Sequence, residues 1–152
     1  MQMCRLGSPS RGRTRHSRRV SDIPSIRAFR AGDESAVAEL CRAEGWDFWD
    51  DAERVRRACL APGVVCLVAE ASGSVVGAVQ VLTDGELNWV ITTMIVAPSA
   101  RGSGLGTRLV RGIFDETGAK RLDVQTEDDG PAFYRRFEGR EMVAFRLYPP
   151  AD

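Results

Sequence analysis

The feature that most constrains the fold is a run of apolar and β-branched residues that leads directly into three closely spaced glycines. The run covers residues 87–96 and ends at Ala97-Pro98, where proline removes a backbone donor and stops the strand. The glycines are Gly102, Gly104 and Gly106. Apolar residues then recur at helical spacing, at Leu105, Leu109, Val110 and Ile113. The sequence therefore predicts a strand, a tight turn and a helix in immediate succession.

A glycine turn that opens a helix presents unpaired N–H groups and the positive end of the helix dipole. Such a site favours an anion, most naturally a phosphate, although a glycine turn also serves simply to reverse the chain. Two familiar phosphate loops are excluded. A P-loop needs Gly-Lys-Ser/Thr, and Lys120 is the only lysine; a dinucleotide fingerprint needs G-x-G-x-x-G, whereas the spacing here is G-x-G-x-G.

The N-terminal stretch differs in composition from the rest of the chain. Residues 1–22 hold six arginines and one acid without a hydrophobic period, so we expect a disordered extension there and one ordered domain over 23–152. Clustered arginines attract nucleic acid, but no aromatic residue is interleaved for stacking on bases. We therefore do not expect a nucleic-acid partner.

Composition also bears on location and on metals. There is no run of about 20 apolar residues and no apolar segment of the kind that follows the basic start of a secretory signal. The four cysteines form no C-x-x-C pair, and His16 is the only histidine. We expect a cytoplasmic protein with no membrane partner and no metal, its thiols acting as small apolar fillers. Twenty arginines against one lysine are typical of GC-rich coding, from which we expect a bacterial source.

Periodicity and turn residues predict the remaining elements. Strands are expected at 25–29, 64–70, 75–82, 87–96, 121–125 and 142–148. Helices are expected at 34–43 with Asp33 as cap, after Asp50 with Glu53 completing a capping box, after the glycines as far as Gly118, and at 131–137. Short hairpin turns are expected at 71–74 and 83–86. The order β-α-α-β-β-β-α-β-α-β predicts an α/β fold with a mixed, mostly antiparallel, twisted sheet and helices on both faces.

Three aromatic residues stand in the polar connection between the first two helices. Trp46, Phe48 and Trp49 form either a hydrophobic clasp or one wall of a ligand pocket.

In this element order the sequence resembles the GNAT (GCN5-related) N-acetyltransferase family over about residues 25–148. The resemblance rests on the strand ending Val96-Ala97-Pro98, on Arg101-Gly102-Ser103-Gly104-Leu105-Gly106, which matches the family signature Arg/Gln-x-x-Gly-x-Gly/Ala, and on Ala132-Phe133-Tyr134. It implies the acyl-CoA N-acyltransferase fold, with acetyl-CoA as co-substrate.

The resemblance also implies roles for individual residues. The pyrophosphate would be held by the backbone of the turn, formed by Arg101, Gly102, Ser103, Gly104, Leu105, Gly106 and Thr107. The pantetheine arm would lie along Met94, Ile95 and Val96, in an opening between this strand and residues 122–125. An N–H near Ile95 would stabilise the oxyanion, and Tyr134 would be the general acid beside the CoA sulfur.

The chain departs from the family pattern at the general base and at its C-terminus. Some members carry a glutamate where this chain has Val90, so the base remains open among Glu86, Glu127 and Asp128. Many members end in a hairpin of two strands, whereas here only residues 142–148 are expected to form one.

The resulting expectation is an N-acetyltransferase that acts by direct transfer in a ternary complex. Acids and aromatics around Trp46, Phe48, Trp49 and Glu86 would suit a small cationic amine. The alternatives are a protein amino group as acceptor and a catalytically silent CoA-binding module. The sequence does not determine the oligomeric state, and a homodimer is one of the states that it allows.

Overall fold

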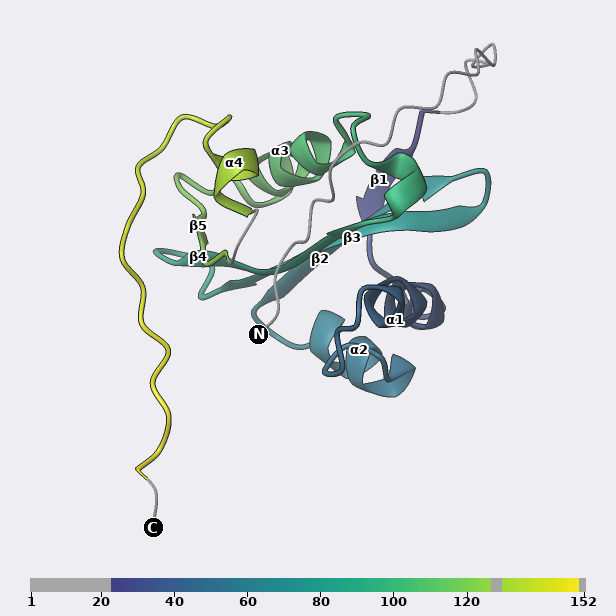
Figure 1. The fold of residues 1–152 in the computed structure, drawn as a ribbon, viewed down its shortest axis with the longest axis horizontal. Helices are drawn as coiled ribbons and strands as arrows, with labels where there is room; N and C mark the ends of the chain where they lie inside the picture. Colours follow the sequence, from purple (N-terminus) through teal and green to yellow (C-terminus); the bar gives the residue numbers. More distant parts are fainter. Residues whose placement is uncertain (1–22, 127–129, 151–152) are drawn as a thin grey trace.

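A computed structural model describes residues 23–126 and 130–150 (Figure 1). Within these residues the strands are β1 (Ser25–Ala28), β2 (Val64–Ala71), β3 (Ser74–Thr83), β4 (Trp89–Val96) and β5 (Asp123–Val124). The helices are α1 (Glu34–Ala43), α2 (Ala52–Cys59), α3 (Leu105–Thr117) and α4 (Gly130–Tyr134), with a short 3-10 turn η2 (Pro98–Ala100) before α3. No helix among the described residues has the length and apolarity needed to cross a membrane.

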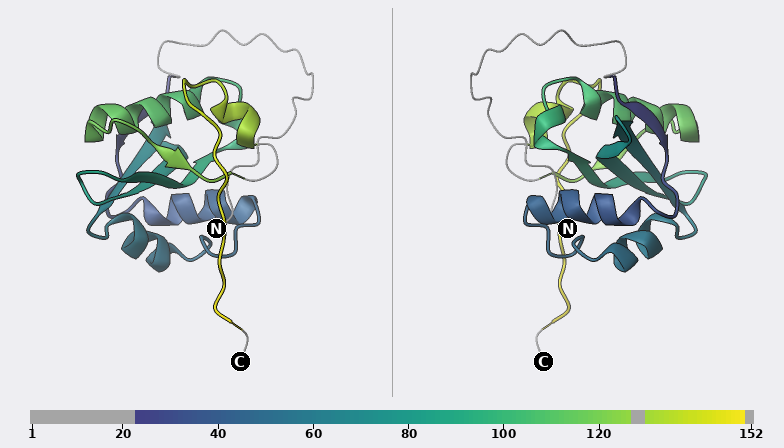
Figure 2. Two further views of the ribbon diagram at one scale, coloured as in Figure 1. Left: turned by 90° about the vertical axis from the view of Figure 1, so that its left-hand side faces the viewer. Right: turned by 90° about the vertical axis from the view of Figure 1, so that its right-hand side faces the viewer.

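The strands form one sheet in the order β1-β2-β3-β4-β5. The first three pairings are antiparallel, and β5 pairs with β4 in parallel because α3 carries the chain back between them. Helices α1 and α2 cover one face of the sheet, and α3 and α4 lie on the other (Figure 2). The expected fold class is confirmed.

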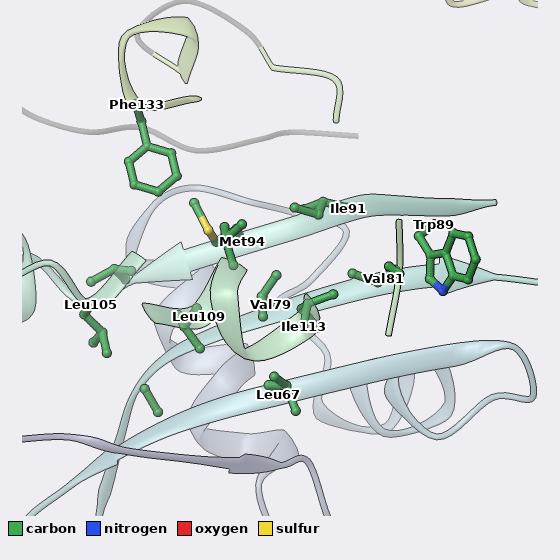
Figure 3. Packing of buried hydrophobic residues seen from close by; sticks show 14 residues of the cluster. Leu67, Val79, Val81, Trp89, Ile91, Met94, Leu105, Leu109, Ile113 and Phe133 are labelled. Atoms are coloured by element: carbon green, nitrogen blue, oxygen red, sulfur yellow. The ribbon is translucent and has the colours of Figure 1, made fainter. Parts of the chain in front are cut away.

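Two hydrophobic clusters occupy the two faces of the sheet. On the α3 face, Leu109 and Ile113 pack against Val79, Ile91 and Met94 (Figure 3). On the α1–α2 face the cluster includes the thiols of Cys41, Cys59 and Cys66. Burial raises the pKa of Cys41 to about 12, and a hydrogen bond with Cys59, together with burial, raises the pKa of Cys66. The thiols of Cys41 and Cys66 therefore stay protonated, and all three buried thiols fill space in the core.

The two hairpin turns differ from each other. Ser72 and Gly73 both have positive φ, at 51° and 78°, which is the geometry of a two-residue type I′ turn. The predicted two-residue turn at Asp84-Gly85 is wrong, because the Asp84 carboxylate accepts the N–H groups of Glu86, Leu87 and Asn88. These bonds hold the pKa of Asp84 below its usual range. They also lengthen the connection, so β4 begins at Trp89 rather than at residue 87.

The helix caps also differ from the sequence prediction. Asp33 stands at the start of α1, but its side chain makes no cap bond there; its carboxylate binds the guanidinium of Arg27 and the N–H of Arg30. Asp51, not Asp50, caps α2 by accepting the N–H of Arg54 at 2.6 Å.

The C-terminal elements are shorter than predicted. The expected strand 121–125 is reduced to Asp123–Val124, and the expected helix 131–137 to Gly130–Tyr134. The predicted strand over 142–148 is wrong: residues 139–150 are exposed and pair with no strand among the described residues. An extended segment needs a neighbour for its backbone groups, and this one runs away from the sheet (Figure 1).

Candidate active site

The turn before α3 is exposed at Gly102, Ser103 and Gly104. Gly102 and Gly104 have φ of 73° and 81°, a region that L-residues rarely adopt, and a Cβ at either would meet no atom within 4 Å. The first helical hydrogen bond joins the Arg108 N–H to the Gly104 carbonyl. The donors of the preceding residues have no helical acceptor. An exposed turn with free N–H groups at a helix N-terminus fits a phosphate group.

Arg101 supports the turn from within. Its Nε donates to the Val96 carbonyl at 3.0 Å, and its guanidinium forms a 2.6 Å ion pair with Glu44 at the C-terminal end of α1. Both side chains are mostly buried, with 20% and 12% exposed. The guanidinium therefore fixes the turn to β4 and α1, and the contact of Arg101 with CoA stays a prediction. Glu44 was missed by the sequence analysis because the pair spans 57 positions.

The C-terminal half of β4 has an open edge next to this turn. Within the part of the chain that the structure describes, β5 pairs with β4 only at Val90 and Ile91. The Ala97 N–H donates to the Val76 carbonyl. Because every second residue of an antiparallel strand is hydrogen-bonded to the same neighbour, the backbone of Ile95 is also bonded to β3. The N–H and C=O groups of Met94 and the N–H of Val96 face the opposite, open edge, where the Val96 carbonyl already accepts the Arg101 Nε. Met94, Ile95 and Val96 are buried with their backbone included, so this edge is open in the sense that it lacks a strand partner among the described residues, not in the sense of exposure to solvent.

A bulge lies at the point where β4 and β5 part. Gln80 is opposite Thr93 and Val81 is opposite Ile91, which leaves Thr92 without a partner in β3. The Thr92 hydroxyl donates to the Gln80 side-chain oxygen at 2.6 Å, and the Gln80 amide donates to the Ala58 carbonyl in α2. Gln80 thus ties the bulge to α2, a role that the strand pattern of the sequence does not reveal.

The three aromatic residues after α1 do not share one role: the hydrophobic clasp and the wall of a ligand pocket fit different members of the set. Trp46 belongs to the core on the α1–α2 face and is 2% exposed, so it forms the hydrophobic clasp. Trp49 packs against the same cluster and is partly buried. Phe48 is 70% exposed, which leaves it as the ring most accessible to a ligand. Because Glu44 binds Arg101, this segment begins beside the glycine turn.

Helix α4 closes against α3 through its aromatic residues. A Cβ on Gly106 would meet the Phe133 ring at 3.1 Å, so the glycine permits close packing of the two helices. The ring of Tyr134 meets that of Phe133 edge to face, with centroids 4.9 Å apart, and its hydroxyl oxygen is buried. The role of Tyr134 as general acid stays a prediction.

The candidate bases lie apart from this edge. Glu86 is exposed in the loop at the N-terminal end of β4, whereas the open amides belong to the C-terminal half of that strand. Glu127 and Asp128 lie outside the described residues. Across residues 23–126 and 130–150, no group of three or more His, Cys, Asp or Glu side chains could hold a metal ion.

Comparison with known proteins identifies the family. A family model described as Acetyltransferase (GNAT) domain matches residues 62–138, which is half of the chain. The chain belongs to the GNAT acetyltransferase family. It is an acetyl-CoA-dependent N-acetyltransferase, and the glycine turn and the open edge of β4 suit that co-substrate. A search of curated protein sequences finds no match to this chain.

Solved structures share the GNAT fold at low sequence identity. An acetyltransferase of Trypanosoma brucei is 23% identical, with a TM-score of 0.63 over 83% of this chain and 99% of that one. A ribosomal-protein-alanine N-acetyltransferase of Brucella melitensis is 16% identical, with a TM-score of 0.68 over 83% and 98%. The aminoglycoside enzyme AAC(6')-Iy, in complex with a bisubstrate analog, is 17% identical, with a TM-score of 0.66 over 84% and 99%.

Proposed function

We propose that this GNAT protein transfers the acetyl group of acetyl-CoA to a primary amine of a small molecule, by direct attack in a ternary complex. The observation that carries the proposal is the open edge of β4 beside the glycine turn. The turn would receive the pyrophosphate, and the N–H and C=O groups of Met94 and the N–H of Val96 would pair with the amides of the pantetheine arm.

The segment after α1 supports a cationic acceptor. Phe48 exposes its ring, and Asp47 and Asp50 stand on either side of it in the sequence. Neither carboxylate makes an ion pair with any described residue, so both remain available to an ammonium group. An aromatic face with nearby carboxylates attracts organic cations. The aminoglycoside acetyltransferases among the structural neighbours act on molecules of this class.

Each step of the transfer has a candidate group. The attacking amine must lose a proton, for which Glu86 acting through water is the candidate base. The negative charge on the carbonyl oxygen needs a donor, and a β4 amide on the open edge is suited to that role. The CoA thiolate leaves more readily when it is protonated, and Tyr134 is the candidate acid.

The test is a thiol-release assay with acetyl-CoA and a panel of amines. The panel should contain aminoglycosides, aliphatic polyamines and a peptide with an N-terminal alanine. We expect turnover with at least one small amine and little with the peptide. Turnover confined to the peptide would favour a protein acceptor, in keeping with the ribosomal-protein-alanine enzyme among the neighbours. Tight CoA binding without turnover on any amine would favour a silent CoA-binding module.

A further inference from the structure

We propose that the acceptor of this enzyme is a primary amine on a hydrocarbon group, and that an apolar row on the sheet, formed by Val64, Leu82 and Val90, binds that group. The inference rests on the proposed transfer to a small amine and narrows the class of that amine. It is carried by side chains that the helices on that face of the sheet leave uncovered.

The three side chains of the apolar row lie next to one another across three strands. Val64 is opposite Leu82, and Leu82 is opposite Val90. The residues beside them along the strands pack in the cluster on the α3 face, namely Val65, Val81 and Ile91. Because successive side chains of a strand point to opposite faces, the apolar row points to the α1–α2 face.

Burial on this face ends between the apolar row and the next row toward the glycine turn. That next row consists of Cys66, Gln80 and Thr93, which are between 3% and 6% exposed. In the apolar row Leu82 is 46% exposed and its two neighbours are partly exposed. The start of β4 extends beyond α1 and α2 in Figure 1, so these helices do not cover it. A contiguous uncovered apolar surface marks a binding site.

The apolar row lies beside the place where the acetyl group is expected. If the pyrophosphate binds the glycine turn and the pantetheine arm runs along Val96 and Met94, the thioester reaches the bulge at Thr92, where β4 and β5 part. Rows on one face of a strand are about 7 Å apart, so the apolar row is one step beyond the thioester. A hydrocarbon group joined to the attacking nitrogen therefore reaches it.

The α3 face is filled near this position, which leaves the α1–α2 face for the acceptor. A Cβ on Gly106 would meet the Phe133 ring at 3.1 Å and the Met94 side chain at 3.9 Å. The segment that contains Phe48 lies before α2, and Val64 lies after it. The carboxylates proposed to attract the ammonium group and the apolar row therefore adjoin the two ends of one helix.

A small molecule fits the apolar row better than a second copy of the chain or another protein. Together with Leu60, which follows α2 and is 48% exposed, the row exposes on the order of 200 Å². A standard protein interface covers about 800 Å² on each partner. A ring or a short alkyl chain covers the smaller area completely, whereas a polyhydroxylated amine would lose hydrogen bonds to water there without replacement.

Thiol release with two amines of equal length tests the preference. Hexylamine and 2-(2-aminoethoxy)ethanol have the same number of non-hydrogen atoms, but the second carries oxygen in place of two of the carbon groups. One buried methylene changes affinity about fourfold, so we expect kcat/KM to favour hexylamine about tenfold or more. Leu82→Gln should lower this ratio at least fivefold. Leu82→Met, which keeps the row apolar, and Ile23→Gln, at an exposed site outside the row, should preserve it.

The outcomes separate this inference from the proposed function. Turnover of small amines without a preference for hexylamine, or with a preference that Leu82→Gln leaves unchanged, overturns the role of the row and leaves the acetyl transfer standing. Turnover of no small amine overturns both. A change of mass in light scattering for Leu82→Gln, with the ratio unchanged, would show that the row binds a second copy instead.

A second variant guards against misfolding of Leu82→Gln. Val90→Thr keeps the shape of the side chain and adds one hydroxyl, so it should lower the ratio in the same direction, by about threefold or more. Calorimetric titration with CoA accompanies each variant, and affinity equal to that of the wild type shows that the variant is folded. A folded Val90→Thr with an unchanged ratio contradicts the inference.

Discussion

Replacing Gly104 with leucine should show whether this glycine matters more for the stability of the fold or for the binding of CoA. Gly104 has φ of 81°, and a Cβ placed there would meet no atom within 4 Å, so the substitution costs backbone strain but meets no clash in the protein. Strain of this kind costs about 1–2 kcal/mol. Gly73 has φ of 78° and equally open surroundings, in the turn between β2 and β3. Gly73→Leu is therefore a control with the same cost in the free energy of unfolding.

Affinity for CoA should distinguish the two variants. If the space beside Gly104 receives the pyrophosphate, the leucine side chain displaces at least one charge-assisted hydrogen bond, worth about 1.5–3 kcal/mol. That corresponds to a loss of affinity of roughly 10- to 150-fold. Urea unfolding should give similar losses of stability for both variants, and calorimetric titration with CoA should show weakened binding for Gly104→Leu alone. Equal CoA affinities in the two variants would refute the assignment of the pyrophosphate to this turn.

Three further substitutions test other parts of the site and fold. Tyr134→Phe should lower kcat at least tenfold in the thiol-release assay with CoA affinity nearly unchanged; unchanged kcat would remove Tyr134 from the mechanism. Glu44→Ala should lower the free energy of unfolding by about 2 kcal/mol and raise KM for acetyl-CoA. The control Glu53→Ala breaks an exposed ion pair and should change the free energy of unfolding by less than about 0.5 kcal/mol. Equal losses in the two variants would show that burial of the Glu44 pair adds no stability. Hydrogen bonds to the Asp33 carboxylate, of which that from Arg27 has the largest effect, hold the pKa of Asp33 below its usual range. The ionised carboxylate therefore stabilises the fold fully above about pH 5, and this stabilisation is lost as pH falls through the folded-state pKa. Urea midpoints measured against pH should therefore fall in acid more steeply for the wild type than for Asp33→Asn, and parallel curves would contradict this.

Much of the fold could be predicted because local pattern and final structure agree. The β2–β3 hairpin, the glycine turn and the end of α3 each follow from residues that lie next to one another in the chain. Gly118, for example, takes the left-handed conformation expected at a helix end, with φ of 65°. Where two neighbouring residues had the same chemistry, as with Asp50 and Asp51, the pattern gave the element but not the residue that caps it.

The features that sequence could not supply depend on contacts between distant residues. The ion pair that fixes the glycine turn joins Arg101 to Glu44, and nothing near either residue indicates the other. The bulge at Thr92 is defined by its register against β3. Residues 142–148 show the opposite case, since the pattern of a strand is present but no described neighbour completes it. Propensity indicates what a segment is able to form, and a partner decides whether it forms.

The short pairing between β4 and β5 has a consequence for the order in which the domain loosens. Among the described residues, only two pairs join β5 to the sheet, whereas β3 is paired on both sides over most of its length. A strand held by so few ladder bonds opens at a much lower free energy than the centre of the sheet. If acyl-CoA binds along the open edge of β4, as proposed, it enters where the sheet opens most readily, so we expect its entry to require a local fluctuation and not global unfolding.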